Sequence, residues 1–286
     1  MKKFISIFIL IFLAMFFSCR KTIDKYEIDN LSDGNVMILG HRGMGELYKY
    51  PGNSFESLYP VIQIGAEGSE IDLQMTLDSV LVLFHDGDLN GNTTCSGYVY
   101  EQTWAQIGAC KYHTVEHNVY LITLENLWSR LENLHELYFS FDCKMYQAIP
   151  DRHAYAHRFA RTIRRMCEQY GMTEHVFIEG NKDFLQTVKE EGLGNKLFVS
   201  QIGTMDNGIQ QAKELNTYGI ACDGSSTYKE EIKRAHDEGF RVMCWGAKTR
   251  GECRDLLEKS PDIIQTDKPI YMLKVFKRFN HKYRIP

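Results

Sequence analysis

The chain has 286 residues, of which 44% are hydrophobic and 24% are charged, and its formal net charge is −4. These proportions are typical of a soluble globular domain, and the small negative charge argues against a polyanion-binding surface, so no nucleic-acid partner is expected. With only 6 prolines and no low-complexity tract, the chain also lacks the composition of a long disordered linker.

The N-terminus has the form of an export signal. The basic pair Lys2-Lys3 precedes an apolar stretch over 4–17, which is too short for a comfortable membrane span. The stretch ends at Ser18-Cys19, which resembles a bacterial lipoprotein processing site. We therefore expect a signal peptide over 1–18 and a tether over 19–35 that carries lipid on Cys19.

Such a tether would hold the protein on a membrane of the bacterial cell envelope, on the extracytoplasmic side. An ordinary secretory signal with an incidental cysteine and a retained membrane helix are the alternatives. The sequence does not decide between inner and outer membrane.

From residue 36 onward, short apolar runs alternate with helical stretches. The strand candidates are 36–41, 69–75, 80–85, 137–144, 175–179, 196–200, 219–222, 240–245 and 262–266. The helix candidates are 54–64, 123–134, 151–170, 182–191, 207–215, 229–237 and 250–258. This alternation predicts a mostly parallel sheet with both faces covered. Nine strands match an eight-stranded α/β barrel with one hairpin arm, in a single domain over 36–286, and a doubly wound open sheet is the alternative.

Acids and histidines stand at the ends of the predicted strands. His41 follows the first apolar run, Glu70 and Asp72 lie on the second strand, and His85 follows the third. Titratable groups are costly at the ends of buried strands unless they are paired, hydrogen-bonded or bound to metal. Active sites of parallel α/β barrels are built at such positions.

The spacing of these residues predicts that they cluster. The linker over 76–79 is too short for a helical crossover, so the next strand should run antiparallel. A two-residue turn places His85 opposite Glu70 or, if the turn lies one residue later, opposite Asp72. The two carboxylates project from one face of their strand, and such close like charges repel unless a cation sits between them.

Eight short motifs, in order over about 36–270, resemble the glycerophosphodiester phosphodiesterase family. They are Gly40-His41-Arg42-Gly43, Pro51-Gly52-Asn53-Ser54, Glu70-Ile71-Asp72, His85-Asp86, Ile122-Thr123-Leu124-Glu125, Asp142-Cys143-Lys144, Val242-Met243-Cys244-Trp245 and the segment 262–269. The resemblance implies a TIM-type (β/α)8 barrel that uses one divalent cation. It also implies cleavage of a glycerophosphodiester into glycerol phosphate and an alcohol.

The resemblance assigns roles to the clustered residues. Glu70, Asp72 and Asp142 would hold the cation, and their oxygen-only ligand set suits both Ca²⁺ and Mg²⁺. His41 and His85 would act as an acid–base pair on opposite sides of the phosphorus. The sequence does not say which of them is the acid.

Substrate contacts are also implied. Arg42 and Lys144 would bind the phosphate, with Asn53 and Trp245 beside the substrate. Other interpretations stay open: Asn53 as a helix cap, Trp245 as a core residue, and Asp142 with Lys144 as a surface ion pair.

Two departures from the family pattern bear on the substrate. Gly52 replaces a family Glu, and Asp142 replaces a family Glu with a side chain that is one methylene shorter. Two other functions therefore stay open. One is a phospholipase-like lyase that stops at a cyclic phosphate, and the other is a lipoprotein that binds phosphorylated headgroups or glycans without turnover.

The 8 cysteines and one histidine pair complete the list of reactive groups. With Cys19 set aside, the odd number and irregular spacing argue against a disulfide framework. Cys95 and Cys110 flank one loop and could pair, although we favour unpaired thiols there. We expect Cys143, Cys222 and Cys244 to be buried thiols. On the helix predicted over 151–170, His153 and His157 have metal-ligand spacing, but the sequence shows no third ligand.

Overall fold

The computed structural model describes residues 26–114, 118–200 and 202–286. The predicted signal peptide and Cys19 lie outside these residues and stay predictions. Within the described ranges, no helix combines the length and the apolar character that a membrane crossing requires.

Residues 26–35, within the predicted tether, contact the barrel. The Asp29 backbone N–H donates to Ser260 Oγ at 3.2 Å, and Ser32 Oγ donates to Asp262 at 2.9 Å. Residues 26–35 therefore belong to the barrel domain and not to the tether.

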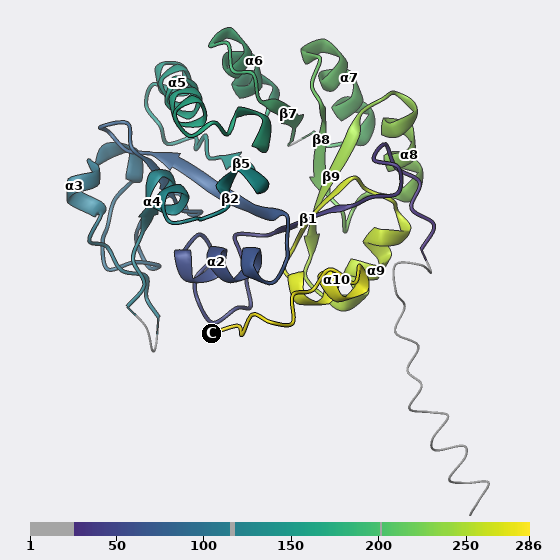
Figure 1. Cartoon of the computed structure of the whole chain (residues 1–286). Helices are drawn as coiled ribbons and strands as arrows, with labels where there is room; N and C mark the ends of the chain where they lie inside the picture. Colours follow the sequence, from purple (N-terminus) through teal and green to yellow (C-terminus); the bar gives the residue numbers. More distant parts are fainter. Residues whose placement is uncertain (1–25, 115–117, 201) are drawn as a thin grey trace, which may run out of the picture.

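Eight parallel strands close into a barrel, with helices around the outside (Figure 1). The strands are β1 (Met37–Gly40), β2 (Gly68–Met75), β5 (Tyr138–Cys143), β6 (Val176–Gly180), β7 (Lys196–Val199), β8 (Gly219–Asp223), β9 (Arg241–Ala247) and β10 (Ile263–Thr266). Because β1 pairs in parallel with both β10 and β2, the ring is closed. The predicted TIM-type barrel is confirmed, and the open-sheet alternative is wrong.

The helices alternate with the barrel strands along the chain. They are α2 (Phe55–Gln63), α4 (Leu124–Ser129), α5 (Arg152–Tyr170), α6 (Lys182–Glu190), α7 (Met205–Leu215), α8 (Lys229–Asp237), α9 (Arg250–Glu258) and α10 (Pro269–Val275). The predicted helix over 123–134 is too long, because α4 ends at Ser129 and the chain turns before the short 3₁₀ segment η3 (Leu134–Glu136) that precedes β5.

The barrel interior has an apolar floor. It is formed by one side chain from each of six strands: Leu39, Phe177, Phe198, Ala221, Met243 and Ile263. The polar groups of the interior lie closer to the carboxyl ends of the strands, where the active sites of such barrels are built.

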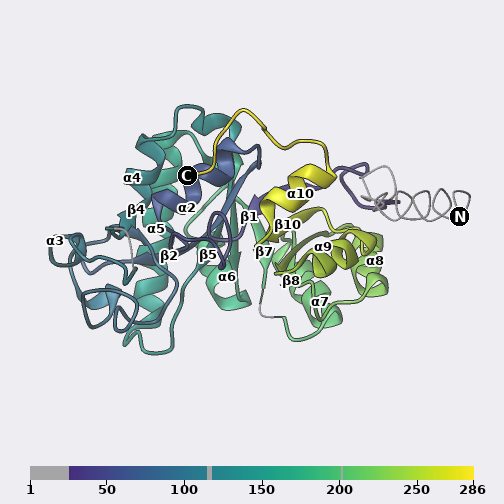
Figure 2. The same cartoon turned by 90° about the horizontal axis from the view of Figure 1, so that it is seen from below.

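An arm interrupts the barrel between β2 and β5 and projects from one side of it, away from α7–α9 (Figure 2). It contains β3 (Leu81–Leu83), β4 (Ile122–Thr123), the short helix α3 (Trp104–Ile107) and the 3₁₀ segment η2 (Val99–Glu101). As predicted, β3 runs antiparallel to β2. Both predicted registers are wrong, because Gln74 pairs with Val82 across a three-residue loop in which Ser79 has φ 63°.

Cys95 and Cys110 form a disulfide within the arm, with their Cα atoms 5.6 Å apart. Our interpretation of them as unpaired thiols is therefore wrong. The physical reason lies in the arm's small core, in which Leu89, Val99 and Ile107 are among the few buried side chains. A cross-link compensates for a core of that size. Cys143, Cys222 and Cys244 are buried free thiols, as predicted.

Removing the bridge should destabilise the protein. The two cysteines are 15 residues apart, and loop-closure entropy for a loop of that length corresponds to about 3 kcal/mol. We expect the Cys95→Ser, Cys110→Ser variant to unfold in denaturant with a free energy about 2–4 kcal/mol lower than wild type. Reductant should lower wild type to the same level and leave the variant unchanged. Equal unfolding midpoints for both proteins would show that the bridge does not stabilise the fold.

Candidate active site

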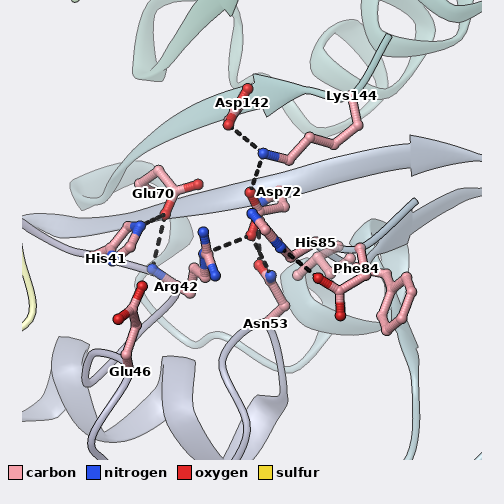
Figure 3. A network of polar contacts seen from close by, with 12 residues as sticks. His41, Arg42, Glu46, Asn53, Glu70, Asp72, Phe84, His85, Asp142 and Lys144 are labelled. Carbon is pink, nitrogen blue, oxygen red and sulfur yellow. Dashed lines mark hydrogen bonds and ion pairs between the residues drawn. The ribbon is translucent and has the colours of Figure 1, made fainter. Parts of the chain in front are cut away.

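With the exception of Trp245, the catalytic, metal-binding and phosphate-binding candidates from the sequence meet at one end of the barrel (Figure 3). His41 and Arg42 follow β1, while Glu70 and Asp72 lie on β2. Asp142 lies on β5, where it is the direct register partner of Asp72. His85 follows β3, whose continuation is fixed by a 3.1 Å bond from the Phe84 N–H to the Asp72 carbonyl.

Asp72 is the centre of the cluster and is fully buried. Its Oδ1 lies 2.7 Å from Lys144 Nζ, and its Oδ2 lies 3.0 Å from Arg42 Nε and accepts a 2.6 Å bond from the Asn53 amide. Burial alone would raise the pKa of Asp72, but the Lys144 and Arg42 charges outweigh it and hold the pKa below its usual value. Asp72 is therefore ionised.

Asn53 orients Asp72 rather than capping a helix. The cap of α2 is Ser54, whose Oγ accepts the Ser57 N–H. Asn53 has φ 63°, a conformation that asparagine tolerates better than most residues, and its Oδ1 accepts the Asp72 N–H at 3.0 Å. The capping interpretation is wrong, and Asn53 holds Asp72 through two reciprocal hydrogen bonds.

Glu70 lies next to this ion-paired centre. Its Oε2 accepts the Arg42 backbone N–H at 2.9 Å and lies 4.0 Å from His41 Nε2. Burial, together with the neighbouring Asp72 and Asp142 charges, raises the pKa of Glu70 well above its ordinary value. Glu70 is thus a buried carboxyl group whose charged form needs an additional positive partner.

Lys144 links two of the three acids. Its Nζ lies 2.5 Å from Asp142 Oδ2 and 2.7 Å from Asp72 Oδ1. Burial would lower the pKa of Lys144, but the charges of Asp72 and Asp142 raise it, so the ammonium group stays charged. Asp142 is 38% exposed, so the expected ion pair with Lys144 is present, but it belongs to the cluster rather than to a separate surface patch.

The three acids fit one divalent cation. One carboxylate oxygen each from Glu70, Asp72 and Asp142 lies within 4.8 Å of the other two. An oxygen-only set of this kind suits a hard cation. Three carboxylates and the two basic side chains Arg42 and Lys144 leave one net negative charge. A divalent cation together with a phosphodiester monoanion would bring one positive charge, so the loaded site would be neutral.

Each candidate histidine is held by an acid. His41 Nδ1 lies 2.9 Å from Asp267 Oδ1, and His85 Nδ1 lies 2.8 Å from Asp86 Oδ1. A carboxylate on Nδ1 fixes the ring and its tautomer, and it leaves Nε2 available for proton transfer. Burial would raise the pKa of Asp267, but the bond from His41 lowers it, so Asp267 can support a positive imidazolium.

Asp267 and Asp86 had no role assigned from the sequence beyond their place in the motifs. Asp86 could have been found as the neighbour of His85. Asp267 follows β10, and its contact with His41 depends on closure of the ring, which places β10 beside β1. An eight-stranded barrel predicts that contact, since its last strand must pair with its first.

A pocket of about 250 Å³ opens between the barrel and the arm. Its lining comes from the loop after β1, the start of α2, the end of β3 and the arm: Arg42, Glu46, Pro51, Gly52, Asn53, Phe84, His85, Asp86, Asn92, Tyr112 and His113. Trp245 is 39% exposed on β9, which rules out a core role. Like His41 and the three acids, it is not among the lining residues of this pocket in the described chain, so its place beside the substrate stays a prediction.

The absence of a side chain at Gly52 leaves room for the side chain of Arg42. A Cβ at this position would lie 2.8 Å from Arg42 Cβ, so the stem of Arg42 fills the space where a side chain would begin. The acid in this part of the pocket is Glu46, from the loop after β1, whose Oε2 lies 3.0 Å from Lys248 Nζ. The pocket therefore contains a carboxylate, although it comes from a different position.

Solved structures with a similar fold include a putative glycerophosphoryl diester phosphodiesterase from Silicibacter pomeroyi, at 18% identity and a TM-score of 0.74 over 84% of this chain and 93% of that chain. Another is an Oleispira antarctica phosphodiesterase in complex with the product sn-glycerol-3-phosphate, at 16% identity and a TM-score of 0.70 over 84% of this chain and 96% of that chain. At such identities the likeness shows the fold alone.

Among curated proteins, a glycerophosphodiester phosphodiesterase from Bacillus altitudinis is 34% identical over 70 residues, which is 24% of this chain and 28% of that protein. The curated relatives are matched over only 22–29% of their own length. The model of the glycerophosphoryl diester phosphodiesterase family, by contrast, matches residues 41–271, which is most of the chain. The chain therefore belongs to the glycerophosphoryl diester phosphodiesterase family.

Proposed function

We propose that the protein is a metal-dependent hydrolase that cleaves glycerophosphodiesters into glycerol phosphate and an alcohol. One observation carries the proposal: two histidines, each held at Nδ1 by a carboxylate, flank a group of three acids and two bases in which Glu70 and Asp72 are buried. Family membership supports the reaction class. The glycerol phosphate bound to the Oleispira neighbour supports the glycerol-phosphate half of the substrate.

Glu70, Asp72 and Asp142 would hold the cation, as Ca²⁺ or Mg²⁺. When bound there, it would polarise the phosphoryl oxygens and stabilise the charge that develops on them. Arg42 and Lys144 are both paired with Asp72 in the structure. A bound cation would neutralise Asp72, and the two basic side chains could then contact the phosphate. Fixed positive charge that is already oriented toward the phosphate stabilises the charge that develops in the transition state.

His41 and His85 would carry the protons through their Nε2 atoms. One ring takes the proton from the attacking hydroxyl, and the other gives a proton to the oxygen of the departing alcohol. If the glycerol 2-hydroxyl attacks, a cyclic phosphate forms as the P–O bond to the alcohol breaks, and water then opens the ring. Asp267 and Asp86 keep both rings oriented through these steps.

An assay with glycerophosphocholine tests the proposal. Purified protein should release choline and glycerol phosphate, lose turnover with chelator, and recover it with Ca²⁺ or Mg²⁺. A cyclic phosphate as the final product would instead identify a lyase. Binding without turnover would identify a non-catalytic binding protein, and full turnover after chelation would contradict the metal site.

The histidines should contribute to the chemical step. His41→Ala and His85→Ala should each lower kcat by roughly 10²–10⁴-fold, the usual effect of losing a proton-transfer residue. The matched control is His236, which forms a 2.9 Å pair with Asp262, before β10 and therefore at the opposite end of the barrel. His236→Ala should lower the unfolding midpoint but keep kcat. A change in KM alone for His41→Ala would argue against a role in proton transfer.

Asp142 should act as a metal ligand. Asp142→Ala should weaken cation affinity and be partly rescued by excess metal, because Glu70 and Asp72 still offer buried oxygens. The Glu70→Ala, Asp72→Ala double variant should not be rescued. Asp142→Glu restores the family residue and should be tolerated. If the metal titration of turnover is the same for Asp142→Ala and wild type, Asp142 serves only as an ion-pair partner of Lys144.

A further inference from the structure

A second cluster of metal-ligating side chains lies on the outside of the barrel, where α5 and α6 pack side by side (Figure 1). His153 and His157 lie one helical turn apart on α5, and Glu190 and Glu191 stand where α6 ends. We propose that this cluster is a second metal site, separate from the carboxylate site, for a divalent transition-metal ion such as Zn²⁺.

The two imidazoles are already spaced as zinc ligands. His153 Nε2 and His157 Nε2 lie 3.3 Å apart. Two nitrogens bound at about 2.0–2.1 Å to a tetrahedral zinc ion lie roughly 3.3 Å from each other. Spacing of four residues places both side chains on one face of the helix, so the backbone of α5 maintains this arrangement.

The other nitrogen of His157 is anchored as it is in metal-bound histidines. His157 Nδ1 lies 2.7 Å from Glu191 Oε1, which also lies 2.8 Å from Arg161. A carboxylate held between Arg161 and the His157 ring is placed to accept the Nδ1 proton. In a neutral ring, His157 Nε2 then accepts from His153 Nε2–H, and a metal ion would replace that proton, which moves to His153 Nδ1 or to solvent. Carboxylates in this position orient metal-binding histidines and make them more basic.

Glu190 would supply the third ligand after its side chain moves, since in the described structure it does not yet form a three-ligand group with the two histidines. Its Oε2 lies 3.9 Å from His157 Nε2, and its side chain is half exposed, so rotation of that side chain can complete the site with water in the remaining position. An ion held in this way would clip α5 to α6. Imidazole nitrogens favour zinc, copper or nickel, whereas the oxygen ligands of the catalytic cluster favour calcium or magnesium, so the two sites should take different metals.

Calorimetric titration of the whole protein with Zn²⁺, in saturating Mg²⁺, tests the proposal. Wild type should bind one Zn²⁺ at this site, and its thermal midpoint should rise because the ion binds the folded state. His153→Ala should weaken binding at least about 10-fold. Glu191→Gln, which keeps both histidines, should weaken it by roughly 10–100-fold. The exposed His281 provides a control, and His281→Ala should bind as wild type does.

Turnover in Mg²⁺ should be unchanged in His153→Ala, since the cluster lies outside the pocket. Equal zinc affinity in wild type, His153→Ala and Glu191→Gln would overturn the proposal. So would zinc binding that survives in His153→Ala but disappears in the Glu70→Gln, Asp72→Asn variant, because the ion would then occupy the carboxylate cluster.

Discussion

The buried charge of Asp72 is the constraint on which the rest of the site depends. A carboxylate without access to water is costly unless charge and hydrogen bonds compensate for it. Three parts of the chain supply that compensation: Arg42 from the loop after β1, Asn53 from the start of α2, and Lys144 from the end of β5. Because each contact also fixes the element that carries it, the loop, the helix and the strand are positioned by the same group that would hold the cation.

Closure of the barrel and the β2–β3 hairpin position the two histidines of the site. Only because β10 pairs with β1 does Asp267 reach His41, and only because β3 folds back on β2 does His85 reach the acids. The apolar side chains Leu39, Phe177, Phe198, Ala221, Met243 and Ile263 fill the barrel interior as a separate cluster. The arm then closes one side of the pocket through Asn92, Tyr112 and His113, so the disulfide that stabilises the arm also supports a wall of the site.

The sequence predicts the closed barrel well, because the alternation of strands and helices is regular and the motifs mark strand ends. It predicts the acid cluster because Glu70 and Asp72 share a face of one strand. The register of the β2–β3 hairpin depends on the positive φ of Ser79, which cannot be predicted from the residue type alone. The role of Asn53 depends on its contact with Asp72 on another element, which local patterns do not encode. The same holds for Glu190 beside His157. The Cys95–Cys110 pair spans only 15 residues and was visible as a possibility, but cysteine spacing alone does not show whether two thiols are bonded.

A crystal structure with Ca²⁺ and sn-glycerol 3-phosphate tests the central claim most directly. The account predicts one ion bound by oxygens of Glu70, Asp72 and Asp142 at roughly 2.3–2.6 Å, with Lys144 Nζ turned from Asp142 toward the phosphate. His41 and His85 should keep their carboxylate partners and face the phosphorus from opposite sides. An ion bound elsewhere, with Arg42 and Lys144 still paired to both oxygens of Asp72, would contradict it.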